Sequence, residues 1–128
     1  MSVVGKHLVV GVDDDFRLRE SLKSLVESAG YAAAVYASAE EFLQSGALAE
    51  AACVVTDVRM PGMNGIELQS RIRLERPELP VIFISAHQDD EARKRAMDEG
   101  ATRFLYKPFD GAELLTVIDA ALQESPGD

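Results

Sequence analysis

The feature that most constrains the fold of this chain is the alternation of short apolar runs with segments of helical periodicity. The runs are strand-length and, for the most part, rich in β-branched or aromatic residues. They are Leu8 to Val12, Ala33 to Tyr36, Cys53 to Thr56, Val81 to Ile84 and Thr102 to Tyr106. Such alternation is typical of a parallel sheet covered by helices on both faces. We therefore expect an α/β fold of three layers, with five parallel strands and five helices.

The segments between these runs place apolar residues three or four positions apart, as amphipathic helices do. Gly30 and Gly100 end two of these helices, Pro77 limits a third, and Ser38 to Glu41 spells a capping box before Phe42 and Leu43. The other expected inward residues are Leu18, Leu22, Leu25, Val26, Ala29, Ile66, Leu68, Ile72, Ala92, Ala96, Met97, Leu114, Val117, Ile118, Ala121 and Leu122.

The length of 128 residues predicts one domain, which we place at residues 1–124, with 125–128 as a tail or the start of a linker. The formal net charge of −9 argues against a direct grip on nucleic acid and against binding to an anionic membrane surface. Cys53 is the single cysteine, so no internal disulfide forms and a cytoplasmic location fits best. The longest apolar runs are too short to cross a membrane.

Polar residues follow the predicted strands directly. Asp13 and Asp14 follow the first strand, Asp57 the third, Ser85 the fourth and Lys107 the fifth. In a sheet of order 2-1-3-4-5 the first and third strands are neighbours, so the three carboxylates meet at one edge. Their mutual repulsion should raise the pKa of at least one of them and favours a hard divalent cation such as Mg²⁺.

Lys107 and Ser85 add an ammonium and a hydroxyl at the same edge. Together with a metal ion, these groups suit an anionic phosphoryl oxygen. The acceptor at such a site must be a nucleophile, and a carboxylate can serve by forming an aspartyl phosphate.

Four segments resemble the marker motifs of bacterial two-component response-regulator receiver domains. They are Val12-Asp13-Asp14-Asp15, Thr56 to Gly65, Ile84-Ser85-Ala86 and Tyr106-Lys107-Pro108-Phe109. The resemblance spans Lys6 to Gln123 and implies a flavodoxin-like fold with strand order 2-1-3-4-5. The segment Ser38 to Leu43 is most similar to receivers of the nitrogen-fixation regulator type, in the LuxR-type helix-turn-helix subfamily.

The resemblance implies a role for each of the acidic residues expected at this edge of the sheet. Asp57 is the expected phosphoacceptor. Asp14, Asp57 and the main-chain carbonyl of Arg59 are the expected ligands of Mg²⁺, with Mn²⁺ as a substitute, and Asp13 acts through a metal-bound water. Asp15 falls outside this pattern and is expected to cap the first helix.

The resemblance also assigns the phosphoryl-binding and switching roles. Lys107, Ser85 and the main-chain amides of Val58 and Ala86 bind the phosphoryl group. Ser85 and Phe104 form the conformational switch, and a cis peptide bond joins Lys107 to Pro108. Arg59 and His87 tune the lifetime of the phosphoryl group. Two alternatives stay open: Phe104 as an ordinary strand aromatic, and His87 as a solvent-exposed loop residue.

The function implied is that of a phosphoacceptor switch rather than an enzyme. A sensor histidine kinase or a phosphotransfer protein supplies the phosphoryl group. The switch then controls an output domain, expected to be transcriptional, or a homodimer through the fourth helix and fifth strand. Charge pairs across that dimer are expected from Arg93, Lys94, Arg95, Asp89, Asp90 and Asp119. No direct nucleic-acid contact and no membrane is expected for this domain.

Three other functions are weighed against this one. A phosphohydrolase that uses an aspartyl phosphate often has an acid two residues after the nucleophile, where this chain has Arg59. A receiver-like binding module without phosphorylation usually lacks one of the site residues, and all are present here. A flavin carrier requires a small-residue loop after the first strand, where this chain has Asp13-Asp14-Asp15.

Overall fold

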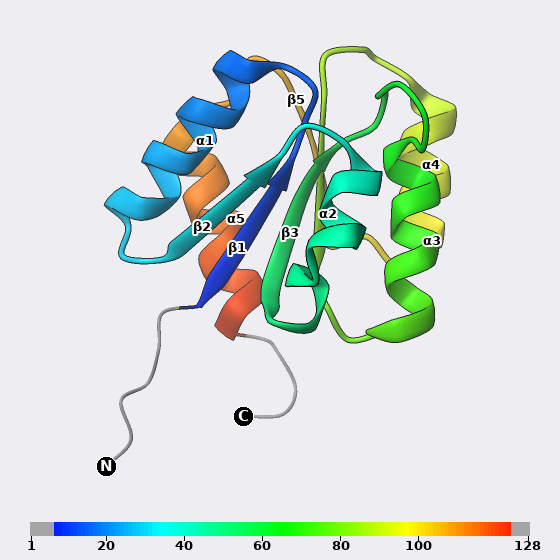
Figure 1. The fold of residues 1–128 in the computed structure, drawn as a ribbon. Coiled ribbons are helices and arrows are strands. Elements are labelled where there is room, and N and C mark those ends of the chain that lie inside the picture. The colour runs from blue at the N-terminus through cyan, green and yellow to red at the C-terminus, as the bar shows by residue number, and fades with distance from the viewer. Residues whose placement is uncertain (1–6, 124–128) are drawn as a thin grey trace.

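The computed structural model describes residues 7–123 and contains a single five-stranded parallel sheet (Figure 1). The strands are β1 (Leu8–Val12), β2 (Ala32–Tyr36), β3 (Ala51–Asp57), β4 (Val81–Ser85) and β5 (Arg103–Tyr106). Their order is β2-β1-β3-β4-β5, and each neighbouring pair is parallel. The predicted fold class and strand order are confirmed.

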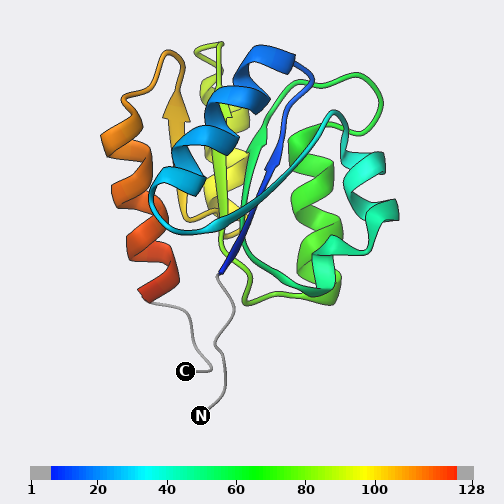
Figure 2. The same cartoon turned by 60° about the vertical axis from the view of Figure 1, so that its left-hand side comes forward.

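Five α-helices cover the two faces of the sheet. They are α1 (Phe16–Ser28), α2 (Ala39–Ser45), α3 (Gly65–Glu75), α4 (Asp90–Asp98) and α5 (Gly111–Gln123). Helices α1 and α5 lie on one face, and α2, α3 and α4 lie on the other (Figure 2). A short 3₁₀ helix, η1 (Ala47–Ala49), precedes β3 and was not predicted.

The core divides into two apolar clusters, one on each face of the sheet. The cluster beneath α1 and α5 includes Leu22, Ile82 and Leu114, and the cluster beneath α2, α3 and α4 includes Phe42 and Leu68. All of these side chains are almost completely buried. Because side chains alternate between the two faces of a strand, the central strands β1, β3 and β4 supply residues to both clusters.

Some of the expected inward residues lie elsewhere. Ala29 is exposed, because α1 has already ended and Ala29 caps its last turn. Met97 is 37% exposed, because α4 buries little beyond Ala96 and its packed face is narrow. Leu43 is half-buried but packs against the core, as predicted. In the capping box, Ser38 accepts a hydrogen bond from the Glu41 amide as predicted, but the Glu41 carboxylate accepts one from the preceding residue, Ala37.

The strand register brings the ends of β1, β3 and β4 to one edge of the sheet. Val12 lies beside Thr56, so the next residues, Asp13 and Asp57, are neighbours. Asp57 in turn lies beside Ile84, which precedes Ser85. The parallel arrangement therefore delivers the polar residues predicted from the sequence to one place.

The predictions of a domain boundary, a tail and no membrane-spanning segment concern the chain as a whole. The domain boundary at residue 124 and the tail at 125–128 lie outside the described residues. Within residues 7–123, no helix combines the length and the apolar character needed to cross a membrane.

Candidate functional site

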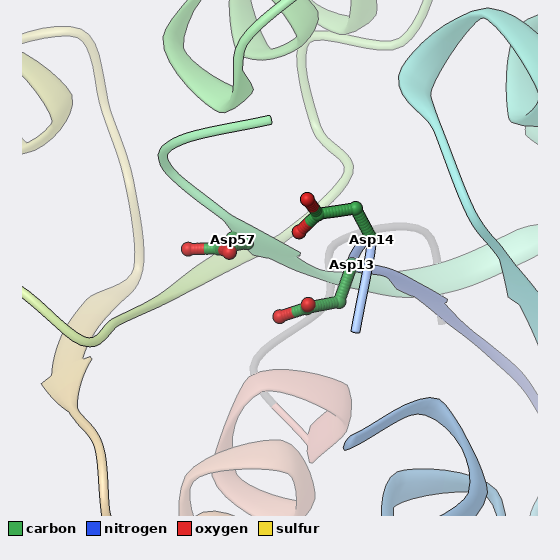
Figure 3. A group of neighbouring side chains, drawn as sticks. All are labelled: Asp13, Asp14 and Asp57. Atoms are coloured by element: carbon green, nitrogen blue, oxygen red, sulfur yellow. The ribbon is translucent and has the colours of Figure 1, made fainter. Parts of the chain in front are cut away.

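Three carboxylates converge at the carboxyl edge of the sheet (Figure 3). One oxygen of each of Asp13, Asp14 and Asp57 lies within 4.8 Å of the others. Asp13 and Asp14 come from the loop after β1, and Asp57 is the last residue of β3. Asp13 and Asp57 are buried, whereas Asp14 is exposed. The cluster is therefore open to solvent on the side of Asp14.

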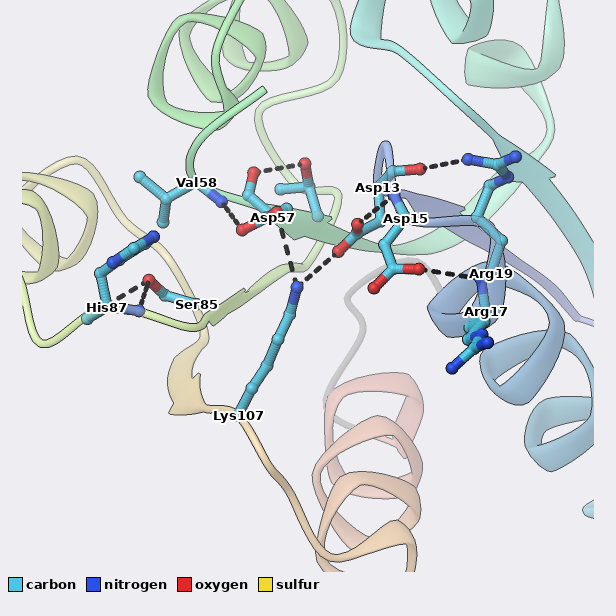
Figure 4. Close-up of polar contacts among 10 residues, drawn as sticks. Asp13, Asp15, Arg17, Arg19, Asp57, Val58, Ser85, His87 and Lys107 are labelled. Carbon is cyan, nitrogen blue, oxygen red and sulfur yellow. Dashed lines mark hydrogen bonds and ion pairs between the residues drawn. The ribbon is translucent and has the colours of Figure 1, made fainter. Parts of the chain in front are cut away.

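Asp13 is fixed at the base of the cluster by bonds to both of its carboxylate oxygens (Figure 4). Its Oδ1 accepts a hydrogen bond from the Asp15 amide at 2.8 Å, and its Oδ2 accepts one from the Lys107 ammonium at 2.9 Å. Arg19 of α1 donates to the Asp13 main-chain carbonyl at 2.9 Å. Asp15 accepts a hydrogen bond from the Arg17 amide and caps α1, as expected.

Asp57 is the carboxyl group of the cluster with a raised pKa. Burial raises the pKa of its carboxyl above the ordinary value, and the negative charge of Asp13 raises it further. Lys107, whose ammonium lies 3.5 Å from Asp57 Oδ2, and the amides of Val58 and Arg59 act in the opposite direction without cancelling the effect. One carboxyl with a raised pKa is what the sequence predicted.

Lys107 reaches the cluster from the end of β5. Burial works against its charge, but the carboxylates of Asp13 and Asp57 outweigh this and raise the pKa of the Lys107 ammonium. Lys107 therefore stays protonated at neutral pH and supplies a fixed positive charge. The expected cis peptide bond between Lys107 and Pro108 is present.

The donor set fits a hard divalent cation. All three side chains offer carboxylate oxygens, which Mg²⁺ prefers. If the Lys107 ammonium and one bound proton each balanced one of these carboxylates, one negative charge would remain. Burial and, after it, the charge of Asp13 raise the pKa of Asp57. A bound cation would offset both effects on the Asp57 carboxylate.

The loop from Val58 to Asn64 sets the backbone next to Asp57. The Val58 amide donates to Asp57 Oδ1 at 2.8 Å, and the Gly65 amide donates to the Val58 carbonyl at 2.8 Å. A Cβ on Gly65 would clash with the Asp57 carbonyl oxygen, so only glycine permits this approach. Asn64 and Glu67 form a full capping box that starts α3. These contacts fix the stretch that contains the Arg59 carbonyl.

The predicted switch residues occupy the adjoining strands. Ser85 is buried, and its hydroxyl bonds within its own turn, donating to the His87 carbonyl at 3.0 Å and accepting from the His87 amide at 3.1 Å. Phe104 is also buried and stacks on Phe83 at a centroid distance of 5.8 Å. Tyr106 packs edge-on against Phe104. The Phe104 ring therefore lies in the core. The Ser85 hydroxyl bonds to the His87 backbone in the loop after β4 (Figure 4).

The remaining predicted residues lie around the mouth. Ala86 and His87 are exposed on the loop after β4. The Arg59 side chain turns to the start of α4, where it forms an ion pair with Asp89 at 3.0 Å. This partner was not foreseen, although the sequence does place Asp89 directly before the helix it caps.

A comparison with protein-family models gives a match to the response regulator receiver domain over residues 9–119. This match covers most of the chain. The chain belongs to the response-regulator receiver family. The predicted resemblance is thereby confirmed.

Individual relatives agree with this assignment. The transcriptional regulatory protein FixJ of Azorhizobium caulinodans is 41% identical over 114 residues, which are 89% of this chain and 54% of that protein. The crystal structure of FixJ-N is 32% identical with a TM-score of 0.82, covering 94% of this chain and 97% of that chain. The chemotaxis protein CheY4 of Vibrio cholerae is 27% identical with a TM-score of 0.85, covering 92% of this chain and all of that one. The chain spans about half the length of the curated relatives it matches.

Proposed function

We propose that this receiver accepts a phosphoryl group on Asp57 from a histidine kinase or a phosphotransfer protein. The observation that carries the proposal is the convergence of Asp13, Asp14 and Asp57 within 4.8 Å, with the Lys107 ammonium bonded to two of them. Asp57 lies 3.5 Å from the Lys107 ammonium and accepts a hydrogen bond from the Val58 amide. It is less deeply buried than Asp13, whose two carboxylate oxygens are both already hydrogen-bonded.

Asp14, Asp57 and the Arg59 carbonyl are the groups proposed to hold Mg²⁺ or Mn²⁺, with Asp13 acting through a bound water. The cation would neutralise the acidic cluster and the charge of an incoming phosphoryl group. This assignment rests on the oxygen-only donor set and on the receiver family's acidic pocket.

The chain's own residues would perform the transfer. An Asp57 carboxylate oxygen attacks phosphorus, and the bond between phosphorus and the donor's imidazole nitrogen breaks with its electron pair returning to that nitrogen. Lys107 and the amides of Val58 and Ala86 are proposed to donate hydrogen bonds to the phosphoryl oxygens. Asp57 must be ionised for the attack, and burial together with the Asp13 charge raises its pKa in the metal-free chain, so a bound cation would favour the ionised form that the attack requires.

The conformational response is proposed to involve Ser85 and Phe104. The Ser85 hydroxyl would leave its bonds with His87 and turn to the phosphoryl group, and the packing of Phe104 against Phe83 and Tyr106 would adjust. Because Phe104 is already buried, the ring would change its packing rather than move in from solvent.

Output through a further domain or a homodimer is the finer part of the proposal. The relative FixJ is named a transcriptional regulatory protein, and this chain spans about half its length. A homodimer through α4 and β5 remains proposed, but several charges assigned to it have partners within the chain. Lys94 pairs with Asp98, Arg95 with Glu99 and Asp89 with Arg59. A phosphorylated chain that shows no self-association in sedimentation would contradict the dimer.

The acceptor function is tested by intact-mass measurement after incubation with acetyl phosphate and Mg²⁺. The wild-type chain should gain about 80 Da, the mass of one phosphoryl group on a side-chain nucleophile. The Asp57→Asn variant should gain nothing, and omission of the metal should suppress the gain. An equal gain in the variant would overturn the proposal.

A further inference from the structure

One carboxylate joins the mouth of the acidic cluster to helix α4. Asp89 Oδ1 accepts a hydrogen bond from the Ala92 amide at 3.0 Å and so caps α4. Asp89 Oδ2 accepts one from Arg59 Nη2, also at 3.0 Å. Arg59 follows the candidate acceptor Asp57 by two residues, so this pair links the acceptor loop to the first turn of α4.

The pair keeps the Arg59 guanidinium away from the acceptor. Among the described residues, Lys107 is the one cation within ion-pair distance of the Asp57 carboxylate. A long, flexible cation beside an acidic cluster is therefore held off it by a competing carboxylate.

Phosphorylation would change this competition. With a dianionic phosphoryl group on Asp57, the carboxylates of Asp13 and Asp14 would face one divalent cation and the Lys107 ammonium. The site would then keep about one net negative charge, which attracts a nearby guanidinium. Arg59 would have to leave Asp89 to respond to that charge.

We infer that Asp89 is a positioning residue that restrains Arg59 and thereby sets how strongly Arg59 affects the phosphoryl group. This inference rests on the proposed phosphorylation of Asp57. In hydrolysis, a water oxygen bonds to phosphorus, the bond from phosphorus to the Asp57 oxygen breaks with its electron pair returning to the carboxylate, and the water proton passes to solvent. A released guanidinium acts on this step, either by stabilising the charge on the phosphoryl oxygens or by covering phosphorus from water.

Because Asp89 also caps α4, the position of the Arg59 side chain affects the first turn of that helix. Two side chains of α3 bond to α4 and its end: Gln69 donates to the Ala96 carbonyl at 3.0 Å, and Ser70 donates at 3.2 Å to Glu99, which follows the last residue of α4. Ala96 is the one fully buried side chain of α4. Loss of the Arg59 contact would leave the first turn of α4 with its cap but without its anchor to the acceptor loop.

The test is a double-mutant cycle on the lifetime of the phosphorylated chain. The variants are Asp89→Asn, Arg59→Gln and their combination, with Asp89→Ser as a second replacement. Asn and Ser both cap helices, so α4 keeps an acceptor for the Ala92 amide, while the charge that holds Arg59 is removed. Asp98→Asn is the matched control, because it removes a carboxylate of α4 that pairs with Lys94 and not with Arg59.

The lifetime is measured from the decay of the phosphorylated mass after removal of acetyl phosphate. We expect Asp89→Asn and Asp89→Ser to change it on the order of three- to tenfold and Asp98→Asn to leave it unchanged. Arg59→Gln should have a small effect alone and should abolish the change caused by Asp89→Asn. A change of either sign supports restraint of Arg59, since the sign reports only what the released guanidinium does.

Equal effects of Arg59→Gln with and without Asp89 would overturn the inference. Amide chemical shifts of the unphosphorylated variants give a second readout. Asp89→Asn should shift resonances in both the loop after β3 and the first turn of α4, and shifts confined to α4 would contradict the link. If the wild-type chain gains no phosphoryl mass at all, the proposed function fails instead, so the two failures are distinguishable.

Discussion

At the residue scale, the energetics of this site are dominated by the burial of Asp57 beside a second carboxylate, Asp13. Asp57 is 8% exposed and lies beside Asp13, which is 1% exposed. Burial and the Asp13 charge raise the pKa of Asp57 in the folded chain. The folded state therefore binds a proton on Asp57 more tightly than the unfolded state does.

This charge imbalance predicts that Asp57→Asn stabilises the apo chain at neutral pH. The free energy of unfolding should rise on the order of 1 kcal/mol, because a buried anion in an acidic cluster is replaced by a neutral isostere. For wild type, the stability contributed by Asp57 is full below its unfolded pKa and is lost as pH rises through its raised folded pKa. The gain from the substitution should therefore shrink in acid.

Urea unfolding of both proteins between pH 4 and 7, without divalent cations, measures this difference. A variant that is less stable than wild type across that range would contradict the account of the charge cluster.

The sequence predicted that Asp13, Asp14, Asp57 and Lys107 lie together, because each stands at or just after the end of a strand and parallel strands end at one edge. It did not predict the Arg59–Asp89 pair. That contact depends on the course of two loops, after β3 and after β4, which periodicity does not describe. The bonds of the Ser85 hydroxyl with His87 were missed for the same reason.

At the element scale, the end of α3 is tied to the start of β3 by one side chain. Arg76 caps α3, and its guanidinium donates to the carbonyls of Leu48 at 3.0 Å and Ala51 at 2.8 Å. It also pairs with Glu78 at 2.9 Å. These carbonyls belong to the turn around η1, which ends where β3 begins. Arg76 therefore joins α3 to the amino end of β3, at the edge of the sheet opposite the acidic cluster.

Arg76→Met should lower the free energy of unfolding by about 2 kcal/mol, because carbonyls that accept charge-assisted hydrogen bonds lose their donor. Arg73→Met is the control, since Arg73 lies on the same helix, is more exposed and pairs with Glu99 only at 3.8 Å. Its effect should stay below about 0.5 kcal/mol. Similar losses in the two variants would show that Arg76 has no special role. Phosphoryl uptake should survive in both.

The helices show where periodicity predicts structure and where it fails. Leu22, Val26 and Leu114 are buried as predicted, because α1 and α5 each pack a broad face on the sheet. Met97 is not, because α4 sits at the margin of its layer and contacts the sheet through little besides Ala96. Gln69 is buried on α3 although it is polar, because its side-chain amide donates a hydrogen bond to the Ala96 carbonyl of α4. No periodic rule identifies such a residue.

At the scale of the whole molecule, the alternation of strands and helices predicted the layers, whereas the strand order came from the family resemblance. The order is what brings β1 and β3 together and so creates the acidic edge. The chain as a whole carries a net charge of −9, which adds to the local repulsion at this edge.

Mg²⁺ should therefore stabilise the folded chain. At a concentration one hundred times the dissociation constant, the free energy of unfolding should rise by about 2.7 kcal/mol, because only the folded state presents the three carboxylates together. Thermal unfolding with MgCl₂, and with NaCl at equal ionic strength, separates binding from general screening. Asp14→Asn should lose most of the effect of Mg²⁺. Equal stabilisation by the two salts would contradict a specific site.

The central claim is that Asp57 receives the phosphoryl group at an edge assembled by the parallel sheet. The most direct measurement is to trap the acyl phosphate by borohydride reduction after incubation with acetyl phosphate and Mg²⁺, and to locate the reduced residue by peptide mass spectrometry. The account predicts homoserine at position 57, only when Mg²⁺ is present. Reduction at Asp13, Asp14 or another residue, or labelling that ignores the metal, would contradict it.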